Sequence, residues 1–177
     1  MVNNIFLDWK SLIPADFQSD SRVWIYQASR LFHISEALQI EGILEDFVTH
    51  WKSHGTPVKG YANLLFGQFV IFMADESATG VSGCSTDSSV RVVKEIEKLF
   101  KVPMFDRQTL AFIKNEKVEL IPMNQFSYAL EHGLINPDTL FFNNLASNKA
   151  ALLNDWLLPV KTSWLSKRFP LLNSDFC

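Results

Sequence analysis

The chain has 177 residues, of which 47% are hydrophobic and 20% are charged, and its formal net charge is −3. A single domain is expected at this length, and such a chain can bury roughly 70% of the surface that its unfolded form exposes. The 15 Phe and 5 Trp residues argue against global disorder. The negative charge balance argues against a broad nucleic-acid-binding face, so we predict no nucleic-acid partner.

The two cysteines, Cys84 and Cys177, are too few for the disulfide framework of a small secreted domain. The segment Met1–Pro14 lacks the basic and then apolar pattern of a signal peptide, and no later run of about 18 apolar residues spans a membrane. We therefore expect a cytoplasmic protein with a reduced Cys84, no membrane partner and no cofactor. A bridge between the two cysteines stays open as an alternative.

The first part of the chain predicts an arm, a strand and a helix. Residues 1–20 mix apolar anchors with a proline and are expected to form an arm that packs onto the body. Residues 23–27 are β-branched and aromatic, which is typical of a strand. A helix is expected from Ser35, as its N-cap, to Gly55, which stops it. Its apolar face is predicted to hold Leu38, Ile40, Ile43, Leu44, Phe47, Val48 and Trp51.

A hairpin and a second helix follow. Two strand-like runs, 58–65 and 68–74, flank a turn at Gly67 and predict a β-hairpin. The next residues form a loop rich in Ser, Thr and Gly. Asp87 or Ser88 is expected to cap the second helix, which ends before Pro103.

The last third predicts shorter elements. A second hairpin is expected over residues 109–121, with its turn at Asn115-Glu116. A short helix at 126–131, a strand at 140–142 and a helix at 146–155 are expected to follow. The tail from Pro159 onward is expected to be irregular. The aromatic residues around this proline, Trp156 and Trp164 among them, can either pack on the body or cover a partner.

The order of elements through residue 121 is β-α-β-β-α-β, which is the order of the ferredoxin-like split unit. We predict an α+β fold in which an antiparallel sheet carries helices on one face, with ferredoxin-like βαββαβ topology as one option. Within a single domain spanning 1–177, the arm covers 1–20, the core 21–122 and a C-terminal extension 123–177.

The loop before the second helix is the strongest candidate for a site. Helix N-termini offer free amides to anions, and Cys84 is expected about one turn before the helix, where a thiolate is favoured. The residues predicted to bind a ligand are Asp75, Ser82, Gly83, Ser85, Thr86, Asp87 and Arg107. The competing interpretation is a capped helix entry, in which Ser, Thr and Asp serve as caps and Cys84 packs as a small apolar group.

Cys84 and His54 are the candidate catalytic residues, as a thiol with its general base. His50 and His54 are four residues apart and can share a helix face, as zinc ligands do. Trp51 stands where the metalloprotease motif H-E-x-x-H has its Glu, and no third ligand is evident, so we predict no metal site. His54 also fits a helix C-terminal position, which favours a protonated histidine.

Several segments together resemble a family of short bacterial proteins that are often labelled ABC transporter ATPases. The matching segments are 23–30, 51–55, Asp75-Glu76, 82–89, 105–107, 142–145 and Ser163-Trp164. The chain departs from the family at Leu165, where a His is expected. An ABC ATPase carries a phosphate loop of the form G-x-x-x-x-G-K-[ST], and no glycine here is followed by Lys and then Ser or Thr. We therefore predict that the chain is not an ABC-type ATPase.

Two classes of function stay open. The first is a non-catalytic interaction or self-association module, which binds a protein partner or a second copy through its sheet face or aromatic tail. The second is a small-anion-binding protein or an enzyme with its site in the loop 75–89, using Cys84 with His54. The sequence does not decide whether the protein is an enzyme.

Overall fold

The computed structural model describes residues 8–77 and 83–169, with the backbone alone at 83–85. The prediction of an α+β fold with antiparallel strands is confirmed. The α-helices (α) and 3-10 helices (η) and the strands are, in chain order, η1 (Trp9–Leu12), β1 (Arg22–Gln27), α2 (Ile34–His50), β2 (Lys52–Ser53), β3 (Thr56–Pro57), β4 (Lys59–Leu65), β5 (Phe69–Asp75), α3 (Gly83–Phe100), β6 (Thr109–Lys114), β7 (Lys117–Pro122), η2 (Met123–Gln125), α4 (Phe126–Glu131), β8 (Leu140–Phe142), α5 (Lys149–Asp155), β9 (Leu157–Pro159), η3 (Val160–Thr162) and α6 (Leu165–Arg168).

The first sheet has the strand order β1-β5-β4, with β5 at its centre. Every residue of β5 is buried, which is what a strand covered on both faces requires. Alternate side chains of β5 belong to different cores. Phe72 packs in the core under α2 and α3, whereas Phe69 packs in the core on the opposite face.

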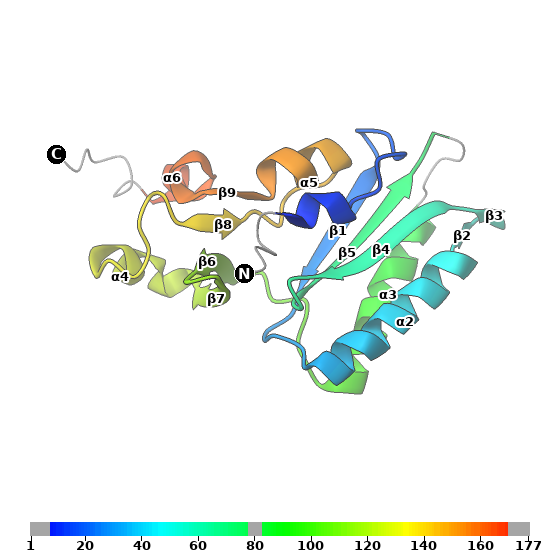
Figure 1. Ribbon diagram of the computed structural model, residues 1–177, viewed down its shortest axis with the longest axis horizontal. Helices are drawn as coiled ribbons and strands as arrows, with labels where there is room; N and C mark the ends of the chain where they lie inside the picture. Colours follow the sequence, from blue (N-terminus) through cyan, green and yellow to red (C-terminus); the bar gives the residue numbers. More distant parts are fainter. Residues whose placement is uncertain (1–7, 78–82, 170–177) are drawn as a thin grey trace.

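Both faces of this sheet are therefore covered, and the sequence anticipated only one of them. The long helices α2 and α3 lie on one face, while η1 and α5 lie on the other (Figure 1). Trp156 is fully buried in this second core, where its ring meets Trp9 edge-on with centroids 4.9 Å apart. The tail tryptophan considered for a partner surface is thus a core residue. None of the helices in the described part of the chain is long and apolar enough to cross a membrane.

The second sheet has the order β7-β6-β8-β9, and it changes the topology from the ferredoxin-like option. In a complete split unit, the strand after the second helix extends the first sheet at β1. Here that strand, β6, pairs with β7 and β8 instead. The first five long elements follow the ferredoxin-like order, but the last strand lies in a separate sheet, and a seam runs between β1 and that sheet.

Both predicted hairpins are confirmed. Phe66 and Gly67 form the turn between β4 and β5 with φ angles of 54° and 62°. Asn115 and Glu116 form the turn between β6 and β7 with φ angles of 50° and 59°. Two consecutive residues with positive φ define the turn whose twist matches that of paired strands.

The ends of α2 differ from the prediction. The helix begins at Ile34 rather than after Ser35, and His33 is its N-cap. The Glu36 carboxylate accepts the His33 N–H at 2.8 Å and two N–H groups of Arg30 at 2.8 and 2.9 Å. These bonds, those from Arg30 first, lower the pKa of Glu36 to about 2. At the other end α2 stops at His50, because β2 and β3 form a short hairpin over the residues expected to be helical.

The start of α3 also differs from the prediction. The helix begins at Gly83, so the predicted caps Asp87 and Ser88 lie inside it. Ser89 is fully buried, and its hydroxyl donates to the Thr86 carbonyl at 2.8 Å. Part of the segment expected to be a polar loop is thus the first turn of a helix of 18 residues.

The buried face of α2 holds fewer residues than the spacing of its apolar residues predicted. Leu44 is 1% exposed in the core under the helix, whereas Leu38, which the pattern placed on the same face, is 64% exposed.

Leu44→Ala should lower the free energy of unfolding by about 2–5 kcal/mol, because it leaves a cavity. Leu38→Ala, the same change on the same helix, should lower it by less than about 1 kcal/mol. Urea denaturation measures both, and equal losses would contradict this orientation of α2.

Candidate functional site

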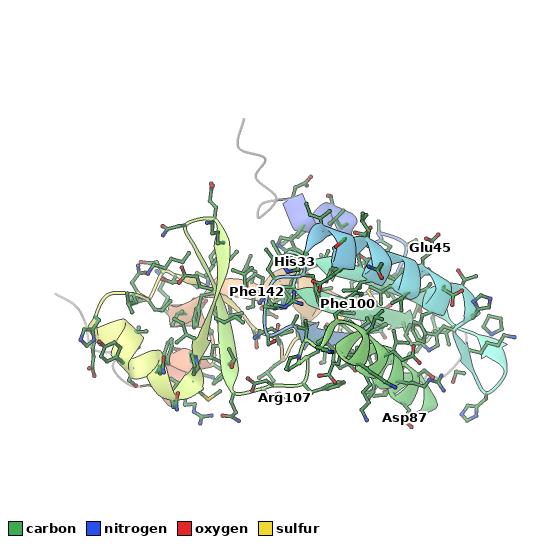
Figure 2. The ribbon with its side chains drawn as sticks, turned by 90° about the horizontal axis from the view of Figure 1, so that it is seen from below. His33, Glu45, Asp87, Phe100, Arg107 and Phe142 are labelled. Carbon is green, nitrogen blue, oxygen red and sulfur yellow. The ribbon has the colours of Figure 1, made fainter. Side chains whose placement is uncertain are left out.

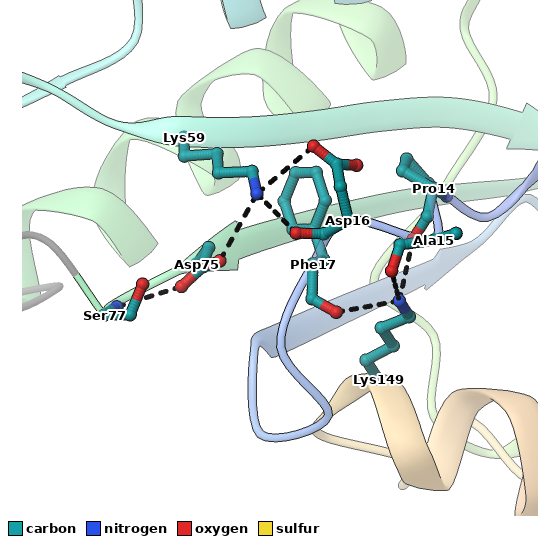
Figure 3. A network of polar contacts seen from close by, with 8 residues as sticks. All are labelled: Pro14, Ala15, Asp16, Phe17, Lys59, Asp75, Ser77 and Lys149. Carbon is teal, nitrogen blue, oxygen red and sulfur yellow. Dashed lines mark hydrogen bonds and ion pairs between the residues drawn. The ribbon is translucent and has the colours of Figure 1, made fainter.

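Asp75, a predicted ligand, lies in a polar network at the end of β5 (Figure 3). Its side chain is 4% exposed and accepts the Ser77 N–H at 2.9 Å. The Lys59 ammonium lies 3.6 Å from Asp75 and 3.2 Å from the Asp16 carboxylate. Hydrogen bonds from Ser77 are the main cause that lowers the pKa of the Asp75 carboxyl. The carboxylate is therefore engaged with the protein's own groups.

The same network fixes the N-terminal arm. Lys149, at the start of α5, is 8% exposed, and its ammonium donates to the carbonyls of Pro14, Ala15 and Phe17 at 2.7, 3.2 and 2.8 Å (Figure 3). A buried ammonium is tolerated when each of its protons has an acceptor, and three carbonyls meet that need here. Lys59 and Lys149 thus hold one arm segment from two sides.

His54 lies in the exposed turn between β2 and β3, with a φ of 50°. It is not at the end of a helix and does not share a helix face with His50, so both of those interpretations are wrong. His50, the last residue of α2, pairs with Asp46 at 3.4 Å. The β2 strand contacts α3, so the turn that carries His54 lies on the side of the domain where α3 begins.

The remaining predicted loop residues are placed only in part. Ser82 lies outside the described residues, and Gly83, Cys84 and Ser85 are known by their helical backbone alone. The pairing of Cys84 with His54 therefore stays a prediction. Asp87 is exposed in the early turns of α3. Over residues 8–77 and 83–169, no group of three His, Cys, Asp or Glu side chains could hold a metal ion.

A groove follows the seam between β1 and the second sheet. Its volume is about 310 Å³, which falls within the range of ligand pockets. Besides β1, β6 and β8, three further parts of the chain line it: the loop from α3 to β6, the loop from β8 to α5, and Trp164 at the start of α6. Its lining residues are Val23, Trp24, Ile25, Tyr26, Gln27, Met104, Phe105, Asp106, Arg107, Thr109, Leu110, Ala111, Phe141, Phe142, Asn144, Leu145, Ala146, Ser147 and Trp164.

Hydrogen bonds join β1 to the second sheet, or to the loop between β8 and α5, at both ends of this groove. At one end the Gln27 amide donates to the Thr109 carbonyl at 3.1 Å and accepts from Asn144 at 2.9 Å. Asn144 in turn accepts the Trp156 indole N–H at 3.0 Å. At the other end the Val23 N–H donates to the Ser147 carbonyl at 2.9 Å. The groove runs along the edge of β1 between the hydrogen bonds of Gln27 and that of Val23.

The backbone of Ile25 faces the groove without a partner. Hydrogen-bonding directions alternate along an antiparallel pair. Because the Val23 N–H points away from β5 to Ser147, the N–H and C=O of Ile25 also point away from β5. No hydrogen bond from any described residue reaches them. One residue of open strand edge is thus presented inside a mostly apolar groove.

Arg107 supplies positive charge beside this edge. It is exposed on the loop after α3, and it makes no ion pair with the part of the chain that the structure describes. Figure 2 shows Arg107 near β6 and β7, and Asp87 at the far end of α3, so these two predicted ligands do not meet. The neighbouring Asp106 carboxylate accepts the Thr109 hydroxyl at 2.6 Å and the Gln108 N–H at 2.7 Å, which lowers its pKa.

Of the predicted site residues whose side chains the structure describes, only Arg107 lines the groove. The sequence analysis did not identify the other residues that line the groove, although Gln27 offered one signal. Gln27 follows the apolar and aromatic run 23–26 and is 8% exposed, and a buried amide requires partners from another segment. The identity of those partners, Thr109 and Asn144, depends on where the second sheet lies and is not readable from spacing.

Comparison with protein-family models, curated proteins and solved structures gives no match to this chain. Its function is therefore inferred from its own geometry.

Asp75 should contribute stability that depends on pH. Since its folded pKa lies below the unfolded value, that stability is present above about pH 4 and is lost as pH falls through the folded pKa. Asp75→Asn should lower the free energy of unfolding by about 1–3 kcal/mol at pH 7, and by progressively less below pH 4. Asp16→Asn, which alters the exposed partner of the same lysine, should change it by less than about 1 kcal/mol. Urea denaturation at several pH values would contradict this role if Asp75→Asn had the same effect at pH 7 and pH 3.

Proposed function

We propose that the protein is a non-catalytic binding module and that its binding site is the groove between β1 and the second sheet. The observation that carries the proposal is the open backbone of Ile25 inside that groove. Binding sites for small ligands and peptide segments are concave and mostly apolar, with a few placed polar groups. This groove combines an apolar wall, a free strand edge and the exposed cation of Arg107.

The chemistry of the lining supports binding rather than catalysis. None of its residues, all of which lie in the described part of the chain, is a His or a Cys. The Thr109 hydroxyl, a possible nucleophile, donates to Asp106 within its own loop. An open strand edge recognises a partner by hydrogen bonds and breaks no covalent bond.

The two walls also expose apolar side chains at their rims. Phe105 is 37% exposed on the loop after α3, and Leu145 is 65% exposed on the loop after β8. Exposed apolar groups that flank a concave site favour a ligand with an apolar body. Arg107 on the same rim favours an anionic group on that ligand.

The probe 8-anilinonaphthalene-1-sulfonate, which has two aromatic rings and one sulfonate, tests the proposal. We expect one saturable site per chain, seen as a fluorescence increase in titration. Arg107→Gln should weaken binding at least about fivefold, because a charge-assisted hydrogen bond is lost. Leu145→Glu should also weaken it, because it places a carboxylate on the apolar rim.

Two matched variants lie away from the groove. Arg91→Gln removes an exposed arginine from α3, and Leu134→Glu alters a leucine that is 47% exposed after α4. Both should leave the affinity unchanged, and circular dichroism should show all four variants folded. No saturable binding, or equal losses in the groove and control variants, would contradict the proposal.

A further inference from the structure

We infer that the groove takes the carboxyl terminus of a partner protein, with its last amide bonded to Ile25, its carboxylate at Arg107 and an apolar last side chain against the groove wall. This inference rests on the proposed binding function and names the chemistry of the partner. Three independent features carry it: the length of the open edge, the sign of the charge and the placement of the apolar rims.

The length of the open edge favours a chain end over a strand that runs through the groove. The Val23 N–H is already bonded to Ser147, and the Gln27 side chain spans the seam to Thr109. Four residue steps of strand separate these ties, which is about 13 Å. Of the three residues between Val23 and Gln27, Ile25 is the one whose N–H and C=O both point away from β5. One residue of a peptide can exchange two hydrogen bonds with it, and the peptide must then end or turn away.

The charge beside the edge favours a carboxyl terminus over an amino terminus. Arg107 is exposed and has no ion-pair partner in the described part of the chain. Asp106, its neighbour in the sequence, already accepts two hydrogen bonds, from Gln108 and Thr109. A guanidinium pairs with a carboxylate through two parallel N–H bonds. The group of the site that is free to bind a ligand is therefore the Arg107 cation, and a terminal carboxylate fits it.

The rims favour an apolar last residue. Phe105 and Leu145 line the groove from two different loops and keep 37% and 65% of their surface exposed. The largely buried Leu110 and Phe141 line the same groove. A Leu, Val or Phe side chain placed there would remove apolar surface of both rims from water, which stabilises the complex.

The test is a titration of the ¹⁵N-labelled full chain with N-acetyl-Ala-Val-Leu bearing a free carboxylate, followed by amide chemical shifts. We expect the shifts of Ile25 and Arg107 to move most. The same peptide with a C-terminal amide should bind at least about tenfold more weakly, and Arg107→Gln should remove the preference for the free carboxylate. Arg91→Gln should leave that preference intact.

Three outcomes would overturn the inference. The first is equal affinity for the peptide acid and the peptide amide. The second is a titration in which the Ile25 amide shift does not change. The third is binding of N-acetyl-leucine as tight as that of the tripeptide, which would identify a small acylated amino acid as the ligand. Failure of the proposed function is distinguishable from all three. If the sulfonate dye binds in the groove and the peptide does not, the binding module stands and the peptide terminus is wrong. If neither binds, both proposals fall.

Discussion

The outer edge of β1 is the constraint on which the rest of the structure depends. A strand edge must bond to something, because unpaired backbone groups that are removed from water destabilise a fold. Among the residues that the structure describes, no single strand takes the edge of β1. A backbone carbonyl of Ser147 takes one end, side chains take the other, and Ile25 is left between them. The separation of the two sheets, the groove and the proposed site all result from that arrangement.

The second sheet stays in place because its contacts with the first are both apolar and directional. Phe69 of β5 and Phe142 of β8 lie with ring centroids 4.4 Å apart, and Trp156 packs on both of them. The relay from Trp156 through Asn144 and Gln27 then fixes the register of the two sheets. Aromatic packing stabilises the contact, while the buried amides specify one relative position because each must keep its partner. The groove is therefore held open by a rigid frame.

Local signals in the sequence predicted the local structure well. Gly67 and Asn115 marked turns that need positive φ, and both hairpins are where those residues place them. The start of α3 was missed because Ser, Thr and Asp are favoured both as caps and in a first helical turn. The end of α2 was missed because Gly55, interpreted as a helix stop, instead turns the short hairpin of β2 and β3, with a φ of 80°. In both cases the residue type was informative and its role depended on tertiary context.

The site was less accessible to sequence reasoning. A polar loop before a helix attracts attention because its composition is unusual, and most of its placed residues serve the fold, as Asp75 does with Lys59. The groove has no compositional signature, since it consists of ordinary strand and loop residues from distant parts of the sequence. Only a strand order can reveal such a site, and strand order is a long-range property that spacing does not encode.

Hydrogen exchange at three adjacent amides of β1 tests the central claim most directly. If the edge is open at Ile25, its amide should exchange with solvent much faster than those of Trp24 and Tyr26, which face β5. Comparable slow exchange at all three positions would mean that the edge of β1 has a partner within the protein, and the account of the groove would be wrong.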